Sequence, residues 1–216
     1  KKLRIGIAGL GRLGTVHAAN IACKIPNAEL TAACSIVPAE LEYARKELGV
    51  EKVYADFREM VKDPDVDAVA IVTTSGQHCW QIEAALDAGK HVFSEKPLGV
   101  DVEQCLQAEA AVARHPELTF MLGLMRRYDS SYAYAKKKID AGAIGKPYLV
   151  KATGIDPEAF VEGAIRFAST SGGIFLDMAI HDIDLMRWFL GSEATEVYAM
   201  GCTFKHPDFK AAGDDE

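Results

Sequence analysis

The sequence predicts an α/β protein that opens with a doubly wound parallel sheet and continues into a smaller α+β region. Short β-like runs alternate with helical patterns from the first residues onward. One run, Val66–Thr73, is almost uninterruptedly apolar, as is typical of a parallel strand buried on both faces. A glycine-rich turn joins the first run to the first helix. Together these observations indicate a parallel sheet covered by helices on both sides.

The elements of the first part follow one another at close spacing. Strands are predicted at residues 3–8, 29–36, 52–54, 66–73, 91–94 and 119–122. Helices are predicted from the glycine turn through residue 24 and at residues 38–48, 57–62, 79–88 and 102–115. Pro38 suits the first turn of its helix, and Gly89 suits the end of another.

The pattern changes after about Met125, so we place the domain boundary near Leu124, between residues 1–124 and residues 125–216. The second part is predicted to contain a helix, a strand, an irregular stretch, a longer helix and a strand, at residues 132–140, 148–154, 155–172, 173–190 and 196–204. Because a sheet needs partner strands, we expect more protein to follow Glu216.

Composition excludes several classes of partner. The chain is 49% hydrophobic and 25% charged, with a net charge of -7, so nucleic acid and anionic membranes would repel it. Its apolar stretches are shorter than the roughly 20 residues of a membrane span. The five cysteines are scattered and form no C-x-x-C pair, and no signal peptide is visible. A cytoplasmic protein without a metal site is therefore expected.

The turn after the first strand has the spacing G-x-G-x-x-G. It consists of Gly9, Leu10, Gly11, Arg12, Leu13 and Gly14. The first glycine allows the tight turn, the second lets backbone N–H groups approach a pyrophosphate, and the third lets the helix pack on the strand. Since the turn follows a strand and opens a helix, we expect it to bind a dinucleotide.

An acid that would hold the ribose 2′-hydroxyl is missing at the end of the second strand, where Ser35 stands. A serine can hydrogen-bond a hydroxyl and leaves room for a 2′-phosphate, which Arg12 could reach. NAD is the predicted cofactor, and NADP remains open.

Two further polar groups follow strands at the carboxyl edge, where open α/β sheets bind ligands. The first group is Thr73, Thr74 and Ser75, with His78 opening the next helix. These residues are predicted to contact the cofactor, to cap the helix, or both. The second group is Glu95 and Lys96, before Pro97. Lys96 would lie beside the nicotinamide, or else be a surface lysine before a turn.

A third cluster lies on the long helix of the second part. Asp177, His181 and Asp184 are spaced i, i+4 and i+7, which places them on one helical face. Asp177 can orient His181 and stabilise its protonated form, so His181 is a candidate general base. A structural Asp–His contact within the core is the alternative. A metal site is disfavoured because no third ligand stands at a suitable spacing.

These motifs together resemble the glucose–fructose oxidoreductase/inositol dehydrogenase/rhizopine catabolism family, written Gfo/Idh/MocA. The resemblance covers the glycine loop, Glu95-Lys96-Pro97 and the G-G-x-x-x-D-x-x-x-H-D-x-D stretch at residues 172–184. Within the family, the segments at residues 125–129 and 180–185 are most like the inositol 2-dehydrogenases. Ser35 departs from the family pattern, in which an acid is common there.

The resemblance implies a Rossmann domain followed by an α+β domain with a mainly antiparallel sheet, incomplete here, and a homo-oligomer, a tetramer in the family. It implies that Lys96, Asp177 and His181 are catalytic, and that they contact the substrate together with Arg127, Asp156 and Asp184.

The implied reaction is hydride transfer from a secondary hydroxyl of a cyclic polyol, such as myo-inositol, which gives the 2-keto inosose. His181 would take the hydroxyl proton while Lys96 stabilises the developing alkoxide. Two alternatives remain: an aldose or deoxy-sugar dehydrogenase of the same family, and a non-catalytic dinucleotide-sensing regulator. The presence of all three catalytic residues favours an enzyme.

Overall fold

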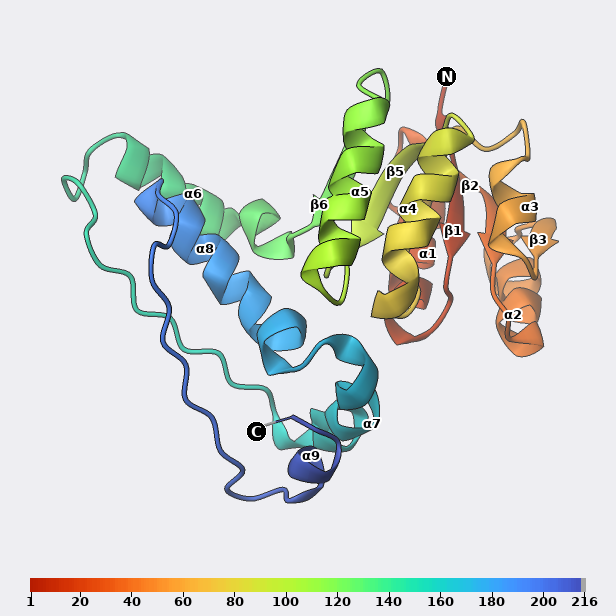
Figure 1. Cartoon of the computed structure of the whole chain (residues 1–216). Helices are drawn as coiled ribbons and strands as arrows, with labels where there is room; N and C mark the ends of the chain where they lie inside the picture. Colours follow the sequence, from red (N-terminus) through yellow and green to blue (C-terminus); the bar gives the residue numbers. More distant parts are fainter. Residues whose placement is uncertain (215–216) are drawn as a thin grey trace. The chain divides into compact units, whose positions relative to one another are not determined.

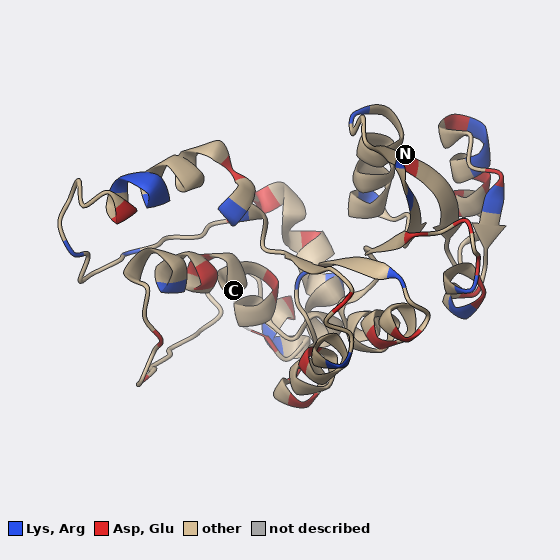
Figure 2. Ribbon diagram, turned by 90° about the horizontal axis from the view of Figure 1, so that it is seen from above, with Lys and Arg blue, Asp and Glu red and all other residues tan. Residues whose placement is uncertain are grey.

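The chain divides into two compact units. The computed structural model describes residues 1–214, and the units are Lys1–Gly123 and Leu124–Glu216 (Figure 1). No described helix has the length and apolar character needed to cross a membrane. Lys and Arg are interspersed with Asp and Glu along the helices of both units (Figure 2).

The first unit is built on a six-stranded parallel sheet with the order β3-β2-β1-β4-β5-β6. The strands are β1 (Leu3–Ala8), β2 (Ala28–Cys34), β3 (Lys52–Tyr54), β4 (Ala68–Ile71), β5 (His91–Glu95) and β6 (Phe120–Gly123). This confirms the predicted doubly wound sheet, although β4 is shorter than the apolar run 66–73. The strand order reverses between β1 and β4, so the carboxyl ends of these strands flank the switch point where such folds bind ligands.

Helices cover both faces of this sheet. On one face lie α1 (Arg12–Cys23) and α2 (Pro38–Leu48), which bury Ala18, Ile21 and Ala44 in one core cluster. On the other face lie α3 (Phe57–Val61), α4 (His78–Asp87) and α5 (Val102–Arg114).

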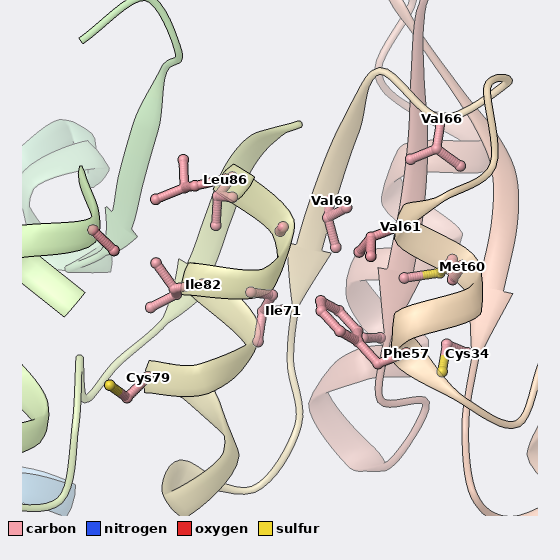
Figure 3. Packing of buried hydrophobic residues seen from close by; sticks show 14 of the residues in the cluster. Cys34, Phe57, Met60, Val61, Val66, Val69, Ile71, Cys79, Ile82 and Leu86 are labelled. Carbon is pink, nitrogen blue, oxygen red and sulfur yellow. The ribbon is translucent and has the colours of Figure 1, made fainter. Parts of the chain in front are cut away.

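The second face carries the larger core. Phe57 and Met60 of α3 and Ile82 of α4 are buried in one cluster with Ile71 on β4 (Figure 3). Small residues, Ala85 on α4 and Ala108 and Ala111 on α5, are buried in the same cluster and let these two helices pack closely. Apolar burial on both faces explains why the central strands read as continuous hydrophobic runs.

A charged cluster holds the opposite, amino-terminal edge of the sheet. Asp63, only 7% exposed, accepts hydrogen bonds from Lys52 (3.0 Å), from the Tyr54 hydroxyl (2.7 Å) and from the Asp65 backbone N–H (2.8 Å). Burial alone would raise the pKa of Asp63, but these three donors outweigh it and lower the pKa to about 2. The cluster joins β3 to the segment before β4.

Asp63→Asn is expected to destabilise the protein by about 2 kcal/mol at neutral pH, because Lys52 loses a charged partner and an amide replaces one acceptor oxygen by a donor. Since the folded pKa is depressed, this stabilisation is present above about pH 4 and is lost as pH falls toward 2. Denaturant unfolding of wild type and variant across this range measures the difference. Glu59→Gln, which breaks the exposed pair with Lys62, is the control and should change stability by less than about 0.5 kcal/mol. A difference in unfolding free energy between wild type and Asp63→Asn that stays constant down to pH 2 would contradict the prediction.

The regular secondary structure described in the second unit is helical. Its elements are a 3₁₀ turn (Met125–Tyr128), α6 (Ser130–Asp140), a second 3₁₀ turn (Glu158–Phe160), α7 (Val161–Ser171), a π-helical turn (Phe175–Ala179), α8 (Ile180–Leu190) and α9 (Asp208–Ala211). The helix predicted at 132–140 is confirmed and begins two residues earlier, because the Asp129 side chain accepts hydrogen bonds from the N–H groups of Ser131 and Tyr132.

Three predictions for this unit are wrong. Residues 148–154 and 196–204, predicted as strands, are irregular, and Tyr148 and Val197 are at least 90% exposed. A strand needs a neighbour for its backbone groups, and no described strand of the second unit supplies one. The stretch predicted as irregular up to Gly172 contains α7, which ends where Gly172 adopts a φ of 88°. The long helix predicted at 173–190 is present, but its first part is the π-helical turn, which is followed directly by α8.

Candidate functional site

The glycine loop is held tightly between β1 and α1. The Gly9 N–H donates to the Cys34 carbonyl at 2.9 Å, and Gly9 has a φ of 84°. A β-carbon on Gly9 would lie 2.4 Å from the Val72 oxygen, and one on Gly14 would lie 2.1 Å from the Gly9 oxygen. These two glycines are therefore required by packing alone, at the turn and at the closest approach of α1 to the loop.

Gly11 differs from its two neighbours in the motif. It is exposed, its φ is -66°, and a β-carbon built on it would have no heavy atom within 4 Å. It precedes α1, whose first turn has neither an acidic residue nor a side-chain cap. The start of α1 is thus open beside Gly11 and carries the positive end of the helix dipole, which fits the pyrophosphate of a dinucleotide.

A carboxylate of α2 that the sequence interpretation missed lies beside the end of β2. Ser35 is 6% exposed, and its hydroxyl donates to Oε2 of Glu40 at 2.5 Å while accepting from the Val37 N–H at 3.0 Å. Glu40 lies in the first turn of α2. The predicted direct contact of Ser35 with the ribose must therefore be revised, because a protein carboxylate takes the serine proton. Spacing offered a signal: an acid five residues after Ser35 in a helix opened by Pro38 can fold back on the strand end.

The side chains after β4 mainly form hydrogen bonds with other groups of the protein. The Thr73 hydroxyl donates to Gln81 at 2.6 Å, and Ser75 is buried. His78 is only 1% exposed, with Nδ1 2.7 Å from the Pro97 carbonyl oxygen and Nε2 3.1 Å from that of Thr73. His78 therefore links the ends of β4 and β5, which corrects its prediction as a direct cofactor contact. Thr74 is exposed and remains accessible at this edge, and no side-chain cap is found at the helix starts of this segment.

The carboxylate of Glu95 positions the lysine loop after β5. Phe93 and Glu95 point to the face covered by α1, since alternate residues of a strand share a face. There the ring of His17 lies 5.4 Å from that of Phe93, and its Nε2 lies 2.8 Å from Oε1 of Glu95. The other carboxylate oxygen of Glu95 accepts from the Lys96 N–H at 3.3 Å. Lys96 is half-buried and is followed by a cis peptide bond to Pro97. No motif or spacing in the sequence indicates that His17 supports this loop.

In the second unit, the candidate base lies at the start of α8. His181 follows the π-helical turn that contains Asp177, and both side chains are partly buried. The prediction that Asp177, His181 and Asp184 share one face of a regular α-helix needs correction, because a π-helical turn has more residues per turn and shifts Asp177 relative to the other two. Such turns occur frequently at functional sites.

Two arginine–aspartate pairs fix α8 to the 3₁₀ turn Met125–Tyr128. Arg127 binds both carboxylate oxygens of the buried Asp184 at 2.7 and 2.8 Å, and this partner raises the pKa of Arg127. Arg126 pairs with Asp182. The resemblance implied that Arg127 and Asp184 contact the substrate, and the structure shows that they bind one another. Asp156 lies exposed in the irregular segment before α7.

The sequence matches two profiles of one protein family. Residues 3–123 match the profile described as "Oxidoreductase family, NAD-binding Rossmann fold", and residues 132–216 match the "GFO/IDH/MocA C-terminal domain". The chain belongs to the Gfo/Idh/MocA oxidoreductase family. Its sheet order, glycine loop and Glu95-Lys96-Pro97 segment are therefore those of a family member, as the resemblance implied.

Several Gfo/Idh/MocA relatives are inositol dehydrogenases. The structure of scyllo-inositol dehydrogenase from Lactobacillus casei with bound cofactor NAD(H) and scyllo-inositol is 53% identical, with a TM-score of 0.94, and the match covers 100% of this chain and 64% of that one. Myo-inositol 2-dehydrogenase of Thermotoga maritima is 37% identical over 98% of this chain and 62% of the relative. The scyllo-inositol 2-dehydrogenase (NAD(+)) of Bacillus subtilis is 39% identical over 99% and 61%. The chain thus spans about three-fifths of the length of these relatives.

Proposed function

We propose that this chain carries the dinucleotide-binding domain and residues of the substrate domain of an NAD-dependent dehydrogenase that oxidises a secondary hydroxyl of an inositol. The observation that carries the proposal is the open space over Gly11 at the start of α1, next to two tightly packed glycines. The L. casei relative, solved with NAD(H) and scyllo-inositol at 53% identity, supports both the cofactor and the substrate class.

The cofactor would be held along the carboxyl edge of the sheet in the first unit. The backbone of the loop Gly9–Gly14 would bind the pyrophosphate, and Thr73, Thr74 and the Glu95–Lys96 segment would contact the rest of the dinucleotide. Buried Ser75 and His78 would act through the backbone they hold in place. When bound, the nicotinamide supplies the hydride acceptor.

The chain's own residues would handle the proton and the charge of the reacting oxygen. We propose that His181 accepts the proton of the substrate hydroxyl, while Asp177 stabilises the imidazolium that forms. The ammonium of Lys96 would stabilise the negative charge that develops on the same oxygen. Lys96 and Asp177 act through their charges, whereas His181 needs a neutral ring nitrogen that can accept the proton.

The substrate domain would recognise ring hydroxyls through polar side chains of the second unit. The Arg127–Asp184 pair leaves the other lone pairs and N–H groups of both side chains as possible hydrogen-bond partners, and Asp156 adds an exposed carboxylate. Myo-inositol and scyllo-inositol differ only in the configuration at the carbon that is oxidised, so both give the same ketone. The side of the ring on which the reacting C–H bond faces the nicotinamide would then decide which of the two inositols is oxidised.

The test is a cofactor-reduction assay of the full-length protein with myo-inositol, scyllo-inositol and a panel of pyranoses, each with NAD and NADP. Reduction with an inositol and NAD is the expected result. Faster reduction with a pyranose would favour the sugar-dehydrogenase alternative. Absence of reduction with all substrates, in protein that binds NAD, would reject the dehydrogenase.

Lys96→Met is expected to lower the turnover of the inositol by roughly 10²- to 10³-fold, because it keeps the length of the side chain and removes the charge that stabilises the alkoxide. Steady-state kinetics of the full-length variant measures the loss. Lys62→Met removes an exposed lysine of the same unit and should leave turnover within about two-fold. Turnover of Lys96→Met at the wild-type rate would exclude Lys96 from the chemical step.

A further inference from the structure

The ends of β1 and β2 bring Ser35 next to the glycine loop. Ala8 pairs with Cys34 in the parallel register, and the Cys34 carbonyl accepts from the Gly9 N–H at 2.9 Å. The next residue, Ser35, is fixed on its other side by its own N–H, which donates to the Tyr54 carbonyl of β3 at 3.1 Å. In dinucleotide-binding folds this position normally carries the acid for the ribose hydroxyls.

The Ser35 hydroxyl is already engaged within the protein. Its proton is donated to Glu40 at 2.5 Å, and one of its lone pairs accepts from the Val37 N–H at 3.0 Å. A hydroxyl has one proton and two lone pairs, so Ser35 has little capacity left for a ligand. Its contacts instead hold a carboxylate at the strand end.

Glu40 has the properties of a ribose-binding acid. It lies in the first turn of α2, where the helix dipole stabilises a negative charge, and its side chain is only partly buried. Ser35 uses one site on one oxygen, whereas a carboxylate offers about four lone-pair sites. Enough capacity remains to accept hydrogen bonds from a vicinal pair of hydroxyls.

We propose that Glu40, anchored by Ser35, replaces the acid that is missing at the end of β2, binds the ribose hydroxyls of the adenosine half of NAD, and excludes NADP. The inference rests on the proposed dinucleotide binding. The physical reason for selectivity is the 2′-phosphate of NADP, which carries roughly two negative charges and would meet the carboxylate instead of a hydroxyl donor. The sequence alone left NADP open because the acid stands five residues beyond the expected position.

The experiment measures dissociation constants of NAD and NADP by calorimetry on the full-length protein. Wild type is expected to bind NAD roughly 100-fold more tightly than NADP. Glu40→Gln should weaken NAD binding about 10-fold and lower the NAD/NADP preference at least 10-fold. Because both nucleotides are titrated into the same preparation, the ratio does not depend on the folded fraction of the variant.

A matched control separates position from net charge. Glu42→Gln makes the same change on the same helix, at an exposed residue paired with Lys46, and should leave the preference within two-fold. Ser35→Ala removes the anchor and should lower the preference less than Glu40→Gln does. Equal binding of NAD and NADP by wild type, or an unchanged NAD/NADP ratio in Glu40→Gln, would overturn the role of Glu40 and leave the proposed function standing. Failure of wild type to bind either nucleotide would overturn the proposed function and this inference together.

Discussion

His181→Ala is expected to reduce inositol turnover by about 10³-fold while the dissociation constant of NAD stays within about two-fold. A general base contributes roughly 10²- to 10⁴-fold to such a step. The cofactor loop and His181 belong to different units, so the loss of the imidazole should not affect the loop itself. Steady-state kinetics and calorimetric titration of the same preparation measure the two effects.

The pH profile distinguishes a base from a packing residue. The rate of hydroxyl oxidation by wild type should rise with pH through a single ionisation, as neutral imidazole accumulates. Asp177→Asn should keep the shape of the side chain and still lose much of the rate, because an amide stabilises imidazolium less well than a carboxylate does. If the Asp–His pair is purely structural, both substitutions would instead lower thermal stability without lowering the turnover of the folded protein.

The control is His115→Ala, which removes a partly buried histidine at the end of α5, and it should turn over within two-fold of wild type. Wild-type turnover in folded His181→Ala would remove His181 from the mechanism. A loss of rate with an unchanged pH profile would assign the observed ionisation to another residue.

Gly11→Ala is expected to leave the fold intact and to weaken NAD binding on the order of 100-fold. The added methyl group meets no heavy atom within 4 Å, and the φ of -66° suits alanine, so the free protein has no reason to unfold. The methyl group would occupy the space through which the pyrophosphate approaches the backbone N–H groups. Losing one or two charge-assisted hydrogen bonds accounts for a change of this size.

Gly14→Ala should instead destabilise the fold, with a loss of stability of more than about 3 kcal/mol. Its β-carbon would lie 2.1 Å from the Gly9 oxygen, so the helix must move away from the loop. Denaturant unfolding and NAD titration of both variants separate packing from binding. NAD binding to Gly11→Ala at the wild-type strength would place the pyrophosphate elsewhere and reject the predicted loop function.

Local interactions made much of the fold readable from the sequence. Five of the predicted strands and the five helices of the first unit follow from hydrophobic periods and turn residues within a few positions, and the sixth strand, β4, differs only in length. The glycine loop was equally readable, because the steric demands on Gly9 and Gly14 arise within six residues and against the neighbouring strand end. The helices near residues 132–140 and 180–190 were found for the same reason.

The pairing of strands that lie far apart in the sequence could not be predicted in this way. Residues 148–154 and 196–204 have strand-like composition, but a strand forms only beside a partner, and the described second unit places none there. Composition also gave no sign of the π-helical turn, which changes the relation of Asp177 to His181 through backbone geometry alone. The apolar spacing of α7, in contrast, is present in the sequence and is sufficient to predict that helix.

For the candidate site, the sequence by itself determined which residues have the required chemistry: a glycine loop for a pyrophosphate, a lysine after a strand, and an Asp–His pair on a helix. Only the tertiary structure decided which groups are committed to other protein groups. His78 is buried between two carbonyls, Arg127 and Asp184 bind each other, and Ser35 gives its proton to Glu40. The physical reason is that a hydrogen bond requires approach to about 3 Å, and residues far apart in the chain reach that distance only when the fold positions them.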